Sequence, residues 1–212
     1  MITFAHMLEG YRRFRQTGWA TQRRRWDELA NGQSPRVMII ACSDSRVDPT
    51  RIFDTDPGEV FVVRNVAALV PPYETNPGRH GVSAAVEFAV QILKVEEVLV
   101  MGHGLCGGCS AALTRTMQDA PIGEGGFIAS WISMLDEARA RVVAAHGDQG
   151  PAALLAMEQE AVKVSLANLR SFPWIREKEA AGQLVLKGAL FAIGDGILHL
   201  LDEDSGTFEA CV

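Results

Sequence analysis

The sequence predicts an α/β fold, in which an open, mainly parallel β-sheet is flanked by helices and preceded by an N-terminal helical arm. Short apolar runs rich in β-branched residues alternate with longer segments of helical periodicity, and this alternation implies parallel strand pairing. An Asp-Gly pair between apolar residues near the C-terminus is typical of a hairpin. We therefore expect about four parallel strands plus an antiparallel edge strand.

The first segment, residues 3–31, is expected to form two helical pieces separated at Gly18. Its apolar side chains recur at helical spacing, at Phe4, Leu8, Tyr11, Phe14, Trp19, Trp26 and Leu29. Arginines make this arm basic, which would also suit nucleic acid or a membrane surface. We favour contact with a neighbouring subunit, because arginine stems cover apolar surface and the chain as a whole is acidic.

The remaining elements follow in alternation. The expected parallel strands are the apolar runs at 36–41, 59–63, 95–101 and 184–193. Helical periodicity places helices at 82–93, 107–117, 130–145 and 151–172. Pro151 suits the first position of the last helix, whose apolar stripe comprises Leu155, Val162, Leu166 and Leu169. The Asp195-Gly196 turn leads into the antiparallel strand at 197–201.

The bulk composition is that of a single domain spanning 1–212, with the arm at 1–31 and the α/β core at 32–212. The chain has 212 residues, of which 48% are apolar and 22% charged, enough for one substantial core. A net charge of -6 argues against nucleic acid as the main partner. Neither a signal peptide nor a membrane-spanning run is visible, so we expect a soluble, cytoplasmic protein with reduced cysteines.

Two short motifs carry the chemistry. Cys42-Ser-Asp44-Ser-Arg46 follows the first expected strand, and His103-x-x-Cys106 follows the third. Ligands bind at the carboxyl ends of strands in open α/β sheets, so these residues are expected to converge. Cys42, His103 and Cys106 are the ligand set of a catalytic zinc that keeps a fourth position for water. We expect one Zn²⁺ per chain.

Asp44 and Arg46 are the expected acid–base pair of this site. Two thiolate ligands cancel the charge of the metal ion and so weaken its acidifying effect on the bound water. A carboxylate that accepts the water's remaining hydrogen bond therefore matters more for activating that water. Asp44 is placed for that role, and Arg46 can keep the Asp44 carboxylate ionised. Taken singly, each residue has an ordinary explanation, such as a turn-capping aspartate or a surface ion pair. The combination favours metal binding.

The Cys106-Gly-Gly-Cys109 sequence leaves two alternatives open. The two cysteines could form a redox pair, or Cys109 could complete a closed structural zinc site with Cys42 and His103. We rank the open site above both, because Cys109 is expected in a first helical turn that faces the core. Cys211 is interpreted as incidental.

At these residues the sequence resembles the β-class carbonic anhydrases, strongly over about 30–120. The motifs follow the order of that family: Gln33-Ser-Pro-Arg36, Cys42-Ser-Asp-Ser-Arg46, Pro57-Gly-Glu-Val-Phe61-Val-Val-Arg64-Asn65-Val66-Ala67, Pro71-Pro72-Tyr73, Ser83-Ala-Ala-Val-Glu87-Phe88-Ala89 and Gly102-His-Gly-Leu-Cys106-Gly107-Gly108.

The resemblance implies roles for individual residues. Cys42, His103 and Cys106 would bind zinc, with Asp44 and Arg46 as the catalytic dyad. Substrate-binding roles fall on a glutamine that reaches the neighbouring subunit's pocket, on a backbone N–H that is a second donor to bicarbonate, and on an apolar wall that holds carbon dioxide. The glutamine is Gln33, and the backbone N–H belongs to Gly107. The apolar wall comprises Phe61, Val66 and Phe88.

The implied activity is zinc-dependent, reversible hydration of carbon dioxide to bicarbonate and a proton, by attack of hydroxide formed at the metal. Such an enzyme is a lyase, a carbonate dehydratase. The implied assembly is a homodimer, or a tetramer, built through the swapped arm. The alternatives are a carbonyl sulfide or carbon disulfide hydrolase on the same fold, and a non-catalytic zinc or redox module using Cys106 and Cys109. His80 and His199 are proton-shuttle candidates by chemistry alone, and surface histidines are the simpler explanation.

The sequence also departs from the family pattern. Gly104 stands where serine is common, and Ala68 where asparagine is common. Some members switch off when the aspartate of the dyad moves onto zinc, supported by a bicarbonate site with a tryptophan and a tyrosine. Ile39 and Phe191 occupy those positions here. We predict that this chain lacks the switch and keeps Asp44 engaged with Arg46 at neutral pH.

Overall fold

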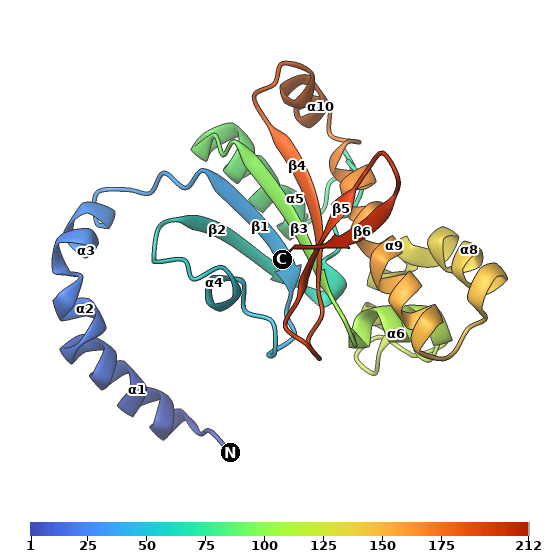
Figure 1. The fold of residues 1–212 in the computed structure, drawn as a ribbon, viewed down its shortest axis with the longest axis horizontal. Coiled ribbons are helices and arrows are strands. Elements are labelled where there is room, and N and C mark those ends of the chain that lie inside the picture. Colours follow the sequence, from blue (N-terminus) through green and yellow to red (C-terminus); the bar gives the residue numbers. More distant parts are fainter. Residues whose placement is uncertain (212) are drawn as a thin grey trace. The chain divides into compact units, whose positions relative to one another are not determined.

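A mixed sheet with strand order β2-β1-β3-β4-β5-β6 organises the chain (Figure 1). The structure, a computed structural model, describes residues 1–211. The strands are β1 (Val37–Cys42), β2 (Val60–Asn65), β3 (Glu97–His103), β4 (Val185–Phe191), β5 (Leu198–Asp202) and β6 (Thr207–Ala210). The first four are parallel, as predicted, and β5 and β6 pair antiparallel.

The predicted antiparallel edge strand is only partly right. β5 follows the Asp195-Gly196 turn and pairs antiparallel with β4, as expected. It does not lie at the edge, because β6 continues the sheet beyond it. β6 was missed, since its four residues are mostly exposed and form no apolar run.

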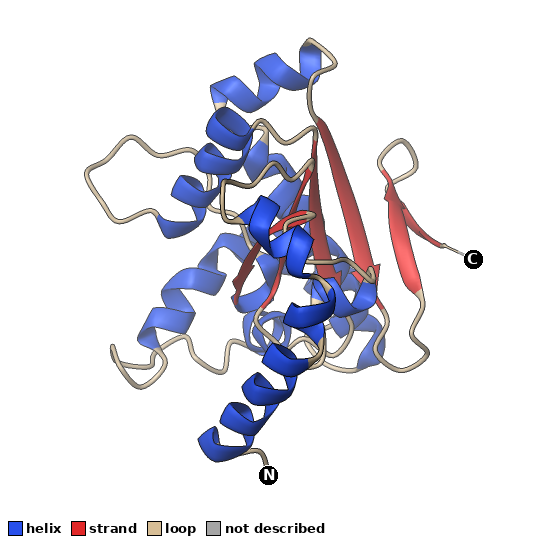
Figure 2. Ribbon diagram, turned by 90° about the vertical axis from the view of Figure 1, so that its left-hand side faces the viewer, coloured by secondary structure: helices blue, strands red, loops and turns tan. Residues whose placement is uncertain are grey.

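The helices of the core fill the connections between strands. They are α4 (Pro49–Ile52), α5 (Gly81–Glu87), α6 (Gly107–Thr114), α7 (Gly126–Ile132), α8 (Asp136–His146), α9 (Pro151–Leu169) and α10 (Pro173–Ala180). Shorter helical turns lie at η1 (Val66–Ala68), η2 (Phe88–Leu93) and η3 (Ser133–Leu135). In Figure 2 the helices of the core lie mainly to one side of the strands.

All four predicted core helices have different bounds, and the one expected at 151–172 ends at Leu169. The helix at 82–93 changes at Phe88 into a π-helical turn. The helix expected at 107–117 ends at Thr114, because Arg115 adopts a left-handed conformation with φ of 55°. The helix expected at 130–145 is divided by η3, since the backbone tightens into a 3-10 turn before Asp136.

Helix α9 packs on the sheet beneath the ends of the strands. Pro151 occupies its first turn, as predicted, and Val162, Leu166 and Leu169 are buried. Leu155 was wrongly placed in the buried stripe and is 46% exposed. Near the start of α9, the buried face is instead the one that carries Ala153, which packs with residues of α6 and α8.

A glycine permits close contact between α9 and β3. A Cβ atom on Gly102 would lie 2.7 Å from Cγ2 of Val162, a distance that real side chains do not reach. Because Gly102 has no side chain, Val162 of α9 can pack directly against the β3 backbone next to His103. On the same side of the sheet, the core is formed by strand residues such as Met38 and Val100 against α5 and α9.

Residues Met1–Ser34 form a separate compact unit, distinct from the unit that begins at Pro35. It contains three helices, α1 (Phe4–Gln16), α2 (Gly18–Thr21) and α3 (Arg23–Leu29), rather than the two predicted pieces. The first break falls at Thr17, and Gly18 starts α2. Helix α1 buries none of its residues, so its apolar side chains remain exposed within this unit.

Helix α1 nevertheless has a defined start. The Thr3 hydroxyl accepts the His6 N–H and the His6 ring accepts the Thr3 N–H, which forms a capping box. Further along, the guanidinium groups of Arg15 and Arg23 lie 4.4 and 4.3 Å from the centroid of the Trp19 ring. The arginines of the arm thus cover aromatic surface, as predicted.

Across the described residues 1–211, no helix combines the length and the apolar character that crossing a bilayer requires.

Candidate metal centre

Two neighbouring parallel strands bring the predicted metal ligands together. Cys42 is the last residue of β1, and His103 is the last residue of β3, which pairs with β1. Cys106 follows three residues later and immediately precedes α6. The three ligand atoms all lie within 4.8 Å of one another. The convergence predicted from the strand ends is therefore confirmed.

The histidine of this cluster is prepared to bind a metal ion. His103 is only 1% exposed. Its Nδ1 lies 2.9 Å from the carbonyl oxygen of Gly104, so Nδ1 carries the proton and Nε2 keeps its lone pair. Among residues 1–211, this buried Nε2 has no hydrogen-bond partner. A buried nitrogen lone pair that lies beside two cysteines and receives no hydrogen bond fits a zinc ligand.

The thiols of the cluster influence one another. Hydrogen bonds from Cys109 and then Cys42 hold the pKa of Cys106 well below its ordinary value, against the effect of burial. The pKa of Cys42 and the pKa of Cys109 are both raised, first by hydrogen bonding to Cys106 and next by burial. Cys106 is thus the most acidic of these three thiols. Cys109 lies in the first turn of α6 and is buried, as predicted.

Asp44 and Arg46 form a bidentate ion pair next to the ligands. Arg46 donates from Nε to Oδ1 of Asp44 at 2.9 Å and from Nη2 to Oδ2 at 2.7 Å. The Arg46 backbone N–H also donates to Oδ1. These hydrogen bonds hold the pKa of Asp44 well below its usual range. Oδ2 of Asp44 lies 4.0 Å from Nε2 of His103, so the ionised carboxylate is adjacent to the ligand cluster.

Arg64, on β2, supports the loop that carries this pair. Its Nε donates to the carbonyl oxygen of Cys42 at 3.0 Å, and its Nη2 donates to the carbonyl oxygen of Asp44 at 2.6 Å. It also forms an ion pair with Asp48 at 3.3 Å. In the sequence, Arg64 stands within one of the family motifs, but no role could be assigned to it from the motif. The available signal was a cation directly after the second expected strand, at 59–63.

Glu158 was missed entirely. It projects from α9, is 3% exposed, and accepts the backbone N–H of Cys106 at 2.9 Å. Burial raises its pKa to about 7, although the Cys106 hydrogen bond acts in the opposite direction. A glutamate at the helical spacing of Val162 and Leu166 was the signal in the sequence, because a charged residue on an apolar stripe needs a buried partner.

The predicted substrate-binding residues lie in several places. Gly107 is the first residue of α6 and is exposed at the helix start. The rings of Phe61 and Phe88 are in contact, with centroids 5.9 Å apart. Val66 lies against the start of α6, where a Cβ atom on Gly108 would be 2.7 Å from its Cγ1. Gln33 belongs to the N-terminal unit.

Among the described residues, no hydrogen bond or ion pair joins either proton-shuttle candidate to the cluster. His80 hydrogen-bonds to the Asn76 carbonyl oxygen at 3.1 Å and lies 3.8 Å from a Glu74 carboxylate oxygen. His199 lies on β5, paired in register with Leu190 and Ala210. Neither histidine gains a catalytic role from this geometry.

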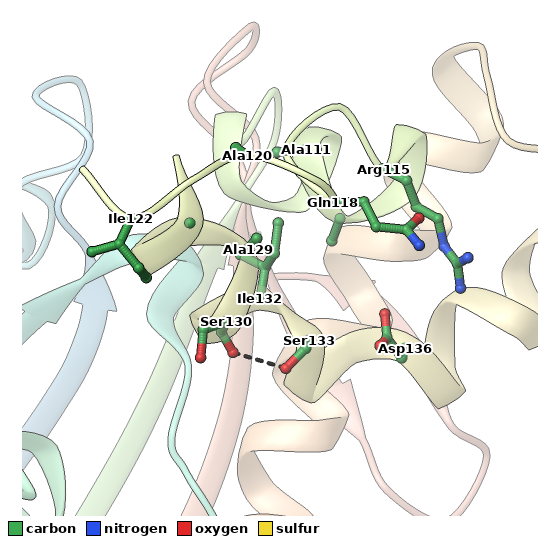
Figure 3. Close-up of a pocket in the computed structure, with 12 residues that line it drawn as sticks. Ala111, Arg115, Gln118, Ala120, Ile122, Ala129, Ser130, Ile132, Ser133 and Asp136 are labelled. Carbon is green, nitrogen blue, oxygen red and sulfur yellow. Dashed lines mark hydrogen bonds between the residues drawn. The ribbon is translucent and has the colours of Figure 1, made fainter. Parts of the chain in front are cut away.

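A cavity of about 360 Å³ lies elsewhere, between α6, α7 and η3. Figure 3 shows Arg115 and Asp136 at one end of it and Ile122 at the other. None of the metal ligands lines it. The chemistry of the chain is therefore concentrated at the strand ends and not in this cavity.

A mixed sheet whose adjacent parallel strands β1 and β3 end beside a buried Cys-His-Cys cluster, next to an ionised Asp–Arg pair, is the architecture of a metal-binding α/β protein. The carbonic anhydrase family matches residues 37–198. Beta carbonic anhydrase 3 of Arabidopsis thaliana is 34% identical over 202 residues, which cover 95% of this chain and 78% of that protein.

Solved structures agree with this match. The β-carbonic anhydrase CcaA superimposes with a TM-score of 0.90 at 29% identity, covering 98% of this chain and 99% of that one. One of two tetrameric β-carbonic anhydrases from Sordaria macrospora superimposes with a TM-score of 0.77 at 30% identity, covering 93% and 96%. The chain belongs to the β-class carbonic anhydrases, which are lyases.

Proposed function

We propose that this chain catalyses the reversible hydration of carbon dioxide to bicarbonate and a proton, with zinc held by Cys42, His103 and Cys106. The observation that carries the proposal is the unpartnered Nε2 of His103, buried within 4.8 Å of two cysteine sulfurs. Zinc bound by two cysteines and a histidine keeps a position for water and lowers the pKa of that water, from 15.7 to ~7 in the most activated sites.

Asp44 is proposed to accept a hydrogen bond from the O–H of the attacking water. Its carboxylate is ionised at neutral pH, because the hydrogen bonds from Arg46 lower its pKa. A carboxylate engaged by a guanidinium is also less free to move onto the metal ion. Arg46 therefore has two effects. It keeps the Asp44 carboxylate charged, and it holds both carboxylate oxygens in a fixed orientation.

The substrate requires an apolar slot and hydrogen-bond donors. Carbon dioxide is uncharged, whereas bicarbonate carries a charge that donors can stabilise as it forms. We assign the slot to Phe61, Val66 and Phe88. We assign a donor role to the backbone N–H of Gly107, the first residue of α6, where a side chain would meet only open space. The amide of Gln33 is the second proposed donor, acting in a neighbouring subunit.

This last assignment requires assembly of the chain with copies of itself. The Sordaria macrospora relatives are tetrameric. In this chain, α1 is a capped amphipathic helix that buries no residue and exposes Phe4, Met7 and Tyr11. We propose that the arm forms a contact between subunits of a homodimer or a tetramer. Light scattering on the full chain tests this, and a strictly monomeric, active protein would contradict it.

The function is tested by stopped-flow carbon dioxide hydration. The zinc-loaded protein is expected to turn over rapidly, and Asp44→Asn to lose about 10²–10⁴-fold of that rate while retaining zinc. Asp54→Asn makes the same chemical change on an exposed residue, and its rate is expected to match the parent. A zinc-loaded parent that hydrates no carbon dioxide would overturn the proposal.

A further inference from the structure

The peptide group between Leu105 and Cys106 is held at both of its polar ends. Its carbonyl oxygen, on Leu105, accepts a hydrogen bond from Nη2 of Arg46 at 3.0 Å. Its N–H, on Cys106, donates to Oε1 of Glu158 at 2.9 Å. Because a peptide group is planar, these two hydrogen bonds set the orientation of one rigid plate. The dyad arginine and a buried glutamate of α9 thus act on the same plate.

This orientation is not one that the local sequence prefers. Leu105 has a φ of 58°, in the left-handed region, which is sterically unfavourable for a residue with a side chain. Packing does not offset that cost, since the Leu105 side chain is 61% exposed. The hydrogen bonds at the two ends of the plate are therefore the interactions on which its orientation depends.

Glu158 is well placed to provide the stronger constraint. Arg46 is long and partly exposed, whereas Glu158 is buried on the longest helix of the described residues, and α9 packs closely against β3. A carboxyl oxygen accepts an amide N–H whether the group is ionised or protonated. The constraint therefore persists in either protonation state.

We propose that Glu158 is a positioning residue for both the zinc ligand Cys106 and the catalytic Arg46. By accepting the Cys106 N–H, it fixes the Leu105–Cys106 peptide. The fixed peptide directs the thiolate of Cys106 into the ligand set and presents the Leu105 carbonyl oxygen to Arg46. Arg46, held there, keeps Asp44 in its bidentate pair. The inference builds on the proposed function.

Two variants of similar size separate this role from simple filling of space. Glu158→Gln keeps an acceptor oxygen at the same position. Glu158→Met fills comparable volume and favours a helix, but it cannot accept the Cys106 N–H effectively. The control is Glu160→Met, two residues away, which breaks the ion pairs with Arg141 and Lys163 and leaves the peptide untouched.

The first readout is the rate at which zinc transfers from the protein to a chelator in excess. Glu158→Met is expected to release zinc about 10–100-fold faster than the parent, with Glu158→Gln and Glu160→Met close to the parent. This measurement needs no turnover, so it remains informative even if the protein does not hydrate carbon dioxide. Equal release from the Met and Gln variants, or parental release from both, overturns the proposal.

The second readout tests the connection to Arg46. In a double-mutant cycle on kcat/KM, Glu158→Met is expected to reduce activity in the parent but to have little further effect beside Arg46→Ala. Additive losses would show that Glu158 acts independently of Arg46.

If Glu158→Met does not fold, amide hydrogen exchange of the parent decides. The Cys106 N–H is expected to exchange slowly in the parent and in Glu158→Gln, and rapid exchange in the parent overturns the proposal.

Discussion

The two carboxylate oxygens of Asp44 are both engaged by Arg46, through Nε at 2.9 Å and Nη2 at 2.7 Å. The pair is anchored from two sides, because Arg46 also bonds the Leu105 carbonyl oxygen and Arg64 holds the Asp44 carbonyl oxygen. The carboxylate is thereby oriented beside the ligand cluster, with its charge retained.

Arg46→Lys is expected to lower kcat/KM for carbon dioxide hydration at least about tenfold while the protein still binds zinc. A lysine ammonium keeps the positive charge but cannot make two parallel hydrogen bonds to a carboxylate. Stopped-flow hydration and zinc content, measured on the same sample, check this. A fully active lysine variant would mean that charge alone suffices and that the bidentate geometry is not required.

The Asp44–Arg46 pair is expected to persist at neutral pH in the presence of bicarbonate. Ile39 is buried in β1 and Phe191 ends β4, so neither offers the hydrogen-bond donors of the tryptophan and tyrosine expected in switching members. A crystal structure of the zinc-loaded protein with bicarbonate is the measurement. Asp44 coordinated to zinc in that crystal would contradict the prediction.

Cys109→Ala is expected to retain one zinc per chain and most of the activity. Cys109 lies in the first turn of α6 and is buried in the core, and the three-residue ligand cluster does not include it. Metal analysis after dialysis, together with the hydration rate, provides the check. Loss of zinc in this variant would support the closed site that the sequence left open.

Glu160→Gln is expected to destabilise the protein at neutral pH by about 1 kcal/mol and to leave it unchanged in strong acid. Burial would raise the pKa of Glu160, but hydrogen bonds from Arg141 and Lys163 outweigh burial and lower it below the ordinary 4.5. A lowered folded-state pKa stabilises the fold above the ordinary value. That stabilisation is lost as the pH falls through the folded-state pKa.

Urea unfolding of the parent and of Glu160→Gln across this range measures the difference. The two stability curves are expected to converge below the folded-state pKa of Glu160. A constant difference at every pH would show that the substitution acts by packing and not through the charge.

The sequence alone was sufficient to predict the strand ends and the residues on them. Cys42 and His103 each end an apolar run. An apolar run of that kind predicts a buried parallel strand, so its last residue is expected at the carboxyl edge of the sheet. The ligand cluster could be predicted because each of its members has a local signal and the topology supplies the rest.

Glu158 and Arg64 could not be assigned in that way. Periodicity marks Glu158 as buried on α9, but its partner is a backbone N–H far away in the chain. Arg64 likewise binds carbonyl oxygens of a loop that precedes it by some twenty residues. Backbone groups are present in every residue, so the sequence contains no mark of which ones need a side-chain partner.

The most direct test of the central claim is a titration of zinc into the metal-free protein, with carbon dioxide hydration measured at each addition. Activity is expected to rise in proportion to bound zinc and to stop rising at one equivalent per chain. Cys42→Ala is expected neither to bind zinc tightly nor to gain activity. Full hydration activity without metal, or one zinc tightly bound without any hydration, would contradict that claim.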